Sequence, residues 1–154
     1  MEKIFHFDSE GGLYRADAAV IYCFDSRFTM AVNKFLKRRG LVQIDIIRIA
    51  GGPKALASPR GEGERAFALD QLRLSRQLHA TARVILISHS DCAACGGLAL
   101  FNGNSQAEAE YHRAELGRAA ACIQSNIPEL AVECFFLDFT GVWRIETAAS
   151  AGSD

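Results

Sequence analysis

Two short clusters of metal-ligating and charged residues stand out in this chain of 154 residues. The first is Cys23-Phe24-Asp25-Ser26-Arg27, and the second is His89-Ser90-Asp91-Cys92-Ala93-Ala94-Cys95. Zinc binds thiolate, imidazole and carboxylate groups in a tetrahedral arrangement. A His-x-x-Cys pair can supply two corners from one loop, and a cysteine from another segment can supply the third. The two clusters therefore predict a metal site made by Cys23, His89 and Cys92.

Other roles for the cysteines stay open on the residues alone. A cysteine at the end of a strand, such as Cys23, is often a small buried residue rather than a ligand. Cys122, in an Ala-rich helical segment, and Cys134, in an apolar strand, are expected to be core thiols. The Cys92-x-x-Cys95 spacing also suits a thiol redox pair. The chain has five cysteines, and an odd count argues against a complete disulfide framework.

The elements that must position these residues follow from the apolar pattern. Continuous apolar runs precede both clusters, as expected for strands that are covered on both faces. Helical spacing of apolar residues separates the runs. The expected elements are a strand over 18–22, a helix through 28–36 closed by Gly40, a strand over 44–49, a helix over 62–79, a strand over 84–87, a helix over 106–125, and strands over 132–137 and 142–145.

This order predicts an α/β fold with a mostly parallel central sheet, helices on both faces and a short antiparallel last strand. Ligands of such sheets lie beyond the carboxyl ends of the strands. Both clusters begin at such an end, which favours a shared site. We expect one domain over residues 1–146 and a disordered tail over 147–154.

Charge and hydropathy argue against a nucleic-acid-binding, membrane or secreted protein. The net charge of −1 and the pI near 6.4 do not indicate a nucleic-acid or membrane surface. No apolar stretch approaches the roughly 20 residues needed to cross a bilayer. Residues 1–17 are charged and lack the apolar core of a signal peptide, so we expect a cytoplasmic protein with reduced cysteines.

The paired motifs resemble those of β-class carbonic anhydrases, which carry Cys-x-Asp-x-Arg after the first strand and His-x-x-Cys after the third. Residues 47–51 (Ile-Arg-Ile-Ala-Gly) and 137–142 (Leu-Asp-Phe-Thr-Gly-Val) are also similar to segments of that family. The resemblance implies a zinc ion held by Cys23, His89 and Cys92, and reversible hydration of carbon dioxide to bicarbonate by zinc-bound hydroxide. Cys95 is a less favoured ligand, because Cys92 has the offset from His89 that the motif requires.

The resemblance also assigns roles to Asp25 and Arg27. They form a dyad in which Arg27 holds Asp25 away from the metal, or releases it to become the fourth ligand. The family's site usually lies near a dimer interface, so we expect a homodimer or a higher homo-oligomer. The aromatic residues Phe5, Phe7 and Phe101 are candidates for that interface.

Three further hypotheses remain beside carbon dioxide hydration. Two features differ from the pattern of the family that the chain resembles: no Gln precedes Cys23, and the loop after Cys92 is altered. Hydrolysis of carbonyl sulfide or carbon disulfide at the same zinc site is therefore a second hypothesis. Closure of the fourth zinc position would give a non-catalytic zinc protein, and Cys92 with Cys95 would give a redox protein. Asp91 is expected to orient a ligand or to cap the next helix, and His112 is expected to have a surface or capping role.

Overall fold

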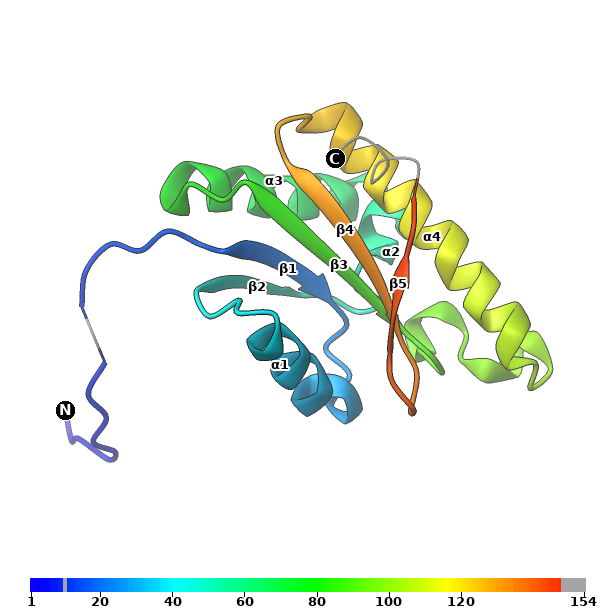
Figure 1. Ribbon diagram of the computed structural model, residues 1–154, viewed down its shortest axis with the longest axis horizontal. Coiled ribbons are helices and arrows are strands. Elements are labelled where there is room, and N and C mark those ends of the chain that lie inside the picture. The colour runs from blue at the N-terminus through cyan, green and yellow to red at the C-terminus, as the bar shows by residue number, and fades with distance from the viewer. Residues whose placement is uncertain (10, 148–154) are drawn as a thin grey trace.

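A five-stranded sheet forms the centre of the protein (Figure 1). The computed structural model describes residues 1–9 and 11–147, so the tail expected over 147–154 lies, Thr147 apart, outside the described residues. The strand order is β2-β1-β3-β4-β5. The strands are β1 (Ala18–Tyr22), β2 (Ile44–Arg48), β3 (Arg83–His89), β4 (Ala131–Leu137) and β5 (Val142–Ile145).

The first four strands are parallel, and β5 pairs antiparallel with β4. This arrangement confirms the predicted fold class. All five residues of β1 are buried, as are six of the seven in β3, which explains their continuous apolar sequences. The edge strand β2 is only partly covered.

Helices cover both faces of the sheet and bury two apolar cores (Figure 1). Helix α1 (Thr29–Arg38) packs on the face that carries Val20 and Ile85. The opposite face carries Ile21 and Leu86. That face is covered by α2 (Lys54–Ala57), α3 (Glu62–His79) and α4 (Ser105–Asn126).

The helix ends follow local chemistry. Gly40 has φ of 75° after the end of α1, which matches the predicted glycine stop. The Asn104 side chain caps α4 by accepting hydrogen bonds from the N–H groups of Gln106 and Ala107, both at 3.0 Å. Four short elements were not predicted, because each has only three or four residues: α2, and the 3₁₀ turns η1 (Ser26–Phe28), η2 (Ala93–Cys95) and η3 (Leu98–Phe101).

The N-terminal segment leaves the body of the domain before β1 (Figure 1). It is attached near β2 and α3, where the Tyr14 hydroxyl donates to Asp45 at 2.7 Å and the Ala16 N–H donates to the His79 carbonyl at 3.0 Å. Among the described residues, no helix has the length and apolar character required to cross a membrane.

Gly52 packs directly against the end of β1. Its φ is +54°, and a Cβ atom there would lie 2.9 Å from backbone atoms of Tyr22 and Cys23. Backbone cannot move aside as a flexible side chain can, so this position requires glycine.

Replacing Gly52 by alanine should therefore lower the free energy of unfolding by roughly 2 kcal/mol, through strain and backbone displacement. Gly117→Ala is the matched control, because Gly117 lies within α4 with open space around it. That change should raise stability by about 0.5–1 kcal/mol. Urea unfolding of both variants measures the difference, and equal stabilities would contradict this account of Gly52.

Candidate metal centre

The parallel pairing of β1 with β3 brings the two sequence clusters together. Tyr22 is in register with Ile87, so Cys23 leaves β1 beside the end of β3. His89 is the last residue of β3, and Cys92 lies in the loop that follows. The ligand atoms of Cys23, His89 and Cys92 all lie within 4.8 Å of one another.

The spacing of these atoms suits a tetrahedral metal ion. The Cys23 and Cys92 Sγ atoms are 4.0 Å apart. Two thiolates on one tetrahedral zinc, each at about 2.3 Å, would be about 3.8 Å apart. The exposed fractions of the three residues are 5% for Cys23, 4% for His89 and 2% for Cys92, so few water molecules would compete for the metal.

The imidazole of His89 is oriented for ligation through Nε2. Its Nδ1 lies 2.8 Å from the Ser90 carbonyl oxygen, which can only accept, so Nδ1 must carry the proton. The Nε2 atom is buried and has no hydrogen-bond partner among the described residues. A buried nitrogen lone pair without a partner is unfavourable unless a metal or another ligand binds it.

Cys23 receives additional support from the backbone. The Gly51 N–H donates to its Sγ at 3.3 Å, which would stabilise a thiolate. Without a metal ion, the hydrogen bond with Cys92 and burial raise the pKa of Cys23 to about 11. The hydrogen bond with Cys23 lowers the pKa of Cys92, but contact with Cys95 and burial outweigh it, giving about 11. A metal must therefore displace two thiol protons, and binding should weaken in acid.

Cys95 lies beside this group without belonging to it. It is buried and packs with Cys23 and Cys92, and its N–H donates to the Cys92 carbonyl at 2.8 Å within the η2 turn. Its sulfur is not among the atoms that lie within 4.8 Å of one another. The geometry therefore favours Cys92 over Cys95 as the ligand from this loop.

Asp25 and Arg27 form a close ion pair at the rim of the site. Arg27 Nε lies 3.1 Å from both carboxylate oxygens of Asp25, and Nη2 lies 2.7 Å from Oδ2. Asp25 also accepts the Arg27 backbone N–H at 3.0 Å, which caps the turn η1 (Ser26–Phe28). The Arg27 hydrogen bond lowers the pKa of Asp25 to about 2. Asp25 is therefore ionised at neutral pH and can only accept hydrogen bonds.

Asp91 binds Arg27 from the other loop. Arg27 Nη1 donates to Asp91 Oδ2 and Nη2 donates to the Asp91 carbonyl, both at 2.9 Å. Asp91 Oδ1 accepts the Leu98 N–H at 3.1 Å at the start of η3. Asp91 is not the N-cap residue of η2 or of η3, which are Cys92 and Gly97, so the two roles expected for it stay predictions. Its contact with Arg27 could not be read from the sequence.

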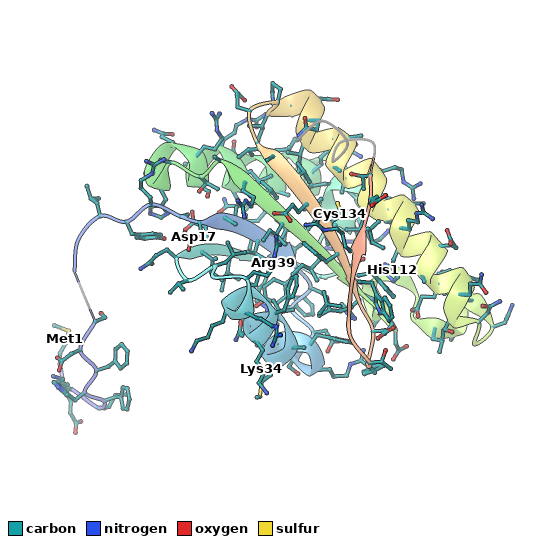
Figure 2. All side chains as sticks on the ribbon, viewed as in Figure 1. Met1, Asp17, Lys34, Arg39, His112 and Cys134 are labelled. Carbon is teal, nitrogen blue, oxygen red and sulfur yellow. The ribbon has the colours of Figure 1, made fainter. Side chains whose placement is uncertain are left out.

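A row of buried polar residues on α4 was missed by the sequence analysis. Glu108, His112 and Glu115 have exposed fractions of 1%, 1% and 3%. The surface or capping role expected for His112 is wrong, because its ring packs against Phe136 on the sheet side of α4 (Figure 2). Helical spacing was the available signal, since these residues lie on the stripe that also carries the apolar Leu116.

The fold and this geometry define the class: an α/β protein whose sheet carries a Cys-His-Cys cluster able to hold a metal ion. The family described as "Putative carbonic anhydrase" matches residues 15–148. The chain belongs to this family. An uncharacterised protein of Rickettsia bellii is 26% identical over 133 residues, which cover 84% of this chain and 81% of that protein.

Solved structures show the same fold. A carbonic anhydrase from Streptococcus mutans superposes with a TM-score of 0.62 at 17% identity, covering 92% of this chain and 89% of that chain. A structure from Sordaria macrospora, described among two tetrameric β-carbonic anhydrases, gives 0.55 at 14% identity, covering 86% of this chain and 81% of that chain. At these identities the similarity establishes the fold alone.

We expect the purified protein to bind one divalent metal ion, and single substitutions should separate ligands from neighbours. Cys23→Ser and Cys92→Ser should lose most of the metal, because a serine hydroxyl is a poor replacement for a thiolate. Cys95→Ser and Cys122→Ser should retain it. Metal content after dialysis measures the difference, and thiolate-to-cobalt charge-transfer absorption of the cobalt form reports the sulfur ligands. Metal loss in Cys95→Ser with retention in Cys92→Ser would contradict the assignment.

Proposed function

We propose that this chain is a zinc enzyme that hydrates carbon dioxide reversibly to bicarbonate, with Cys23, His89 and Cys92 as the metal ligands. The observation that carries the proposal is the Cys-His-Cys cluster with a charged dyad beside it, at the carboxyl edge of the sheet. Membership of the family supports the same reaction. Two thiolates and a neutral imidazole suit zinc, and three protein ligands leave one position open.

When bound, zinc would lower the pKa of a coordinated water to about 7 and so supply a nucleophile at neutral pH. The protein's own groups then have defined tasks. Asp25 is ionised at neutral pH and can only accept hydrogen bonds. It therefore fixes the orientation of a group that donates a hydrogen bond to it. Arg27 holds both oxygens of Asp25 through its planar guanidinium. Asp25 and Arg27 are the residues to which we assign the catalytic role.

An aromatic wall borders the proposed site. The Phe28 ring lies 4.6 Å from the His89 ring and 5.1 Å from the Phe139 ring, measured between centroids. Arg27 lies over the Phe139 ring at 5.5 Å. Such a wall suits a small linear substrate without charge.

We further infer that the protein forms a homo-oligomer in the cytoplasm. Phe5 and Phe7 are 77% and 74% exposed on a segment that leaves the domain, whereas Phe101 packs on Tyr111 at 5.4 Å. The tetrameric Sordaria enzymes offer a precedent within this fold. The five cysteines are free thiols within the described chain, and a reducing cytoplasm would keep them so.

Stopped-flow carbon dioxide hydration above pH 8, on protein with quantified zinc, tests the reaction. The parent protein should be active, and Cys23→Ser should be inactive. Asp25→Asn should lower kcat/KM at least about tenfold with zinc retained, because an amide side chain carries a donor group as well as an acceptor oxygen. Asp70→Asn, at an exposed position on α3, should match the parent.

Absence of hydration at full zinc occupancy would overturn the proposed reaction. Sulfide release from carbonyl sulfide or carbon disulfide would then identify a hydrolase. X-ray absorption with only protein ligands over a wide pH range would indicate a non-catalytic zinc site. A reversible Cys92–Cys95 disulfide in protein that binds no metal would indicate a redox function.

The oligomeric state has its own test. Light scattering of the parent protein should give a mass at least twice the 16.8 kDa of one chain. Phe5→Ser combined with Phe7→Ser should shift the population toward the monomer, since these rings lack cover within one chain. A parent monomer would contradict the inference.

A further inference from the structure

We propose that Glu108 and Asp91 are positioning residues that hold Arg27 and, through it, the Asp25 carboxylate. This inference rests on the proposed function for its catalytic meaning. The underlying observation is a continuous line of hydrogen bonds from the buried face of α4 to the dyad. It runs from Glu108 to the Asp91 backbone, from Asp91 to the Arg27 guanidinium, and from there to Asp25.

The first link is the bond between Glu108 and Asp91. Glu108 Oε1 accepts the Asp91 N–H at 2.7 Å, and the glutamate is only 1% exposed. Burying a carboxylate is unfavourable unless strong donors compensate. A short bond from a backbone N–H is such compensation, and it ties the loop after β3 to the rigid helix α4.

The second link is the backbone conformation of Asp91. Its φ is +52°, a left-handed conformation that aspartate and asparagine tolerate better than most residues. This conformation directs the carbonyl and the carboxylate of Asp91 to Nη2 and Nη1 of Arg27, each at 2.9 Å. The Leu98 N–H, at 3.1 Å from Oδ1, fixes the carboxylate from its other side.

The third link is the guanidinium itself. Arg27 donates through Nε and Nη2 to Asp25, and through Nη1 and Nη2 to Asp91. Arg27 lies in the loop after β1 and Asp91 in the loop after β3. The guanidinium therefore cross-links the two loops that carry the proposed metal ligands. Without Asp91, Arg27 would lose one hydrogen bond at Nη1 and one at Nη2. Asp25 alone would then hold the guanidinium, and less would oppose its rotation about the Nε–Cζ bond.

Two isosteric substitutions and one truncation test this arrangement. Glu108→Gln retains a side-chain oxygen for the Asp91 N–H, whereas Glu108→Ala removes it. Asp91→Asn retains the left-handed backbone and an oxygen for the Leu98 N–H, but loses the second carboxylate oxygen that binds Arg27. Glu110→Ala is the control on the same helix, since the Glu110 side chain is 64% exposed.

The first readout is rotation of the Arg27 guanidinium about its Nε–Cζ bond, followed in nitrogen-labelled protein by NMR. Rotation should be slow in the parent, in Glu108→Gln and in Glu110→Ala, and fast in Glu108→Ala and Asp91→Asn. On zinc-loaded protein, kcat/KM for carbon dioxide should fall about 10- to 100-fold in the latter two. It should stay near the parent value in the others.

Slow rotation in Asp91→Asn and Glu108→Ala would overturn the proposal, as would equal losses of activity in Glu108→Gln and Glu108→Ala. If Glu108→Ala fails to fold, Glu108→Met takes its place, because it keeps the length of the buried side chain without an oxygen for the Asp91 N–H, and Asp91→Asn still tests the contact with Arg27. If the zinc-loaded parent hydrates no carbon dioxide, the proposed function fails. The rotation measurement would still test whether Glu108 and Asp91 hold Arg27, because it does not depend on activity.

Discussion

The parallel pairing of β1 with β3 is the constraint on which the site depends. Strands that run in the same direction end at the same edge of a sheet, so the segments that follow them must meet there. The register of Tyr22 with Ile87 sets how far each strand extends. A slip of one residue would turn every side chain of β1 to the opposite face of the sheet. The two apolar cores, one on each face, prevent such a slip.

Charge balance explains why this edge combines buried thiols with exposed charges. Cys23 and Cys92 are almost fully buried, and a buried thiolate is stable only beside a cation or strong donors. Two thiolates with one divalent ion would form a neutral group, which suits burial. The dyad carries opposite charges, and its Arg27 side chain is 43% exposed. The site thus places its neutral part inside and its charged part at the rim.

The sequence predicted the strands and long helices well because their signals are local and repeated. The predicted helix over 62–79 and strand over 142–145 have the observed bounds. Strand β3 ends at His89, two residues beyond the predicted end of that strand at residue 87. The Cys23-His89-Cys92 grouping was also predictable, since strand ends and ligand types are both visible in sequence. The hydrogen bond from the Gly51 N–H to Cys23 could not be predicted, because it depends on the backbone conformation of a turn that contains two glycines with positive φ.

The polar stripe of α4 shows what a sequence alone can and cannot indicate about support of a site. Glu108 and His112 lie at helical spacing with Leu116, so their burial follows from the same periodicity that identifies the core face. A charged residue on that stripe must find a partner, because an unpaired buried carboxylate is strongly unfavourable. The partner is the Asp91 N–H, in a loop with no repeating pattern. Periodicity can thus reveal that a helix supports something polar, whereas only the packed structure identifies the loop that it supports.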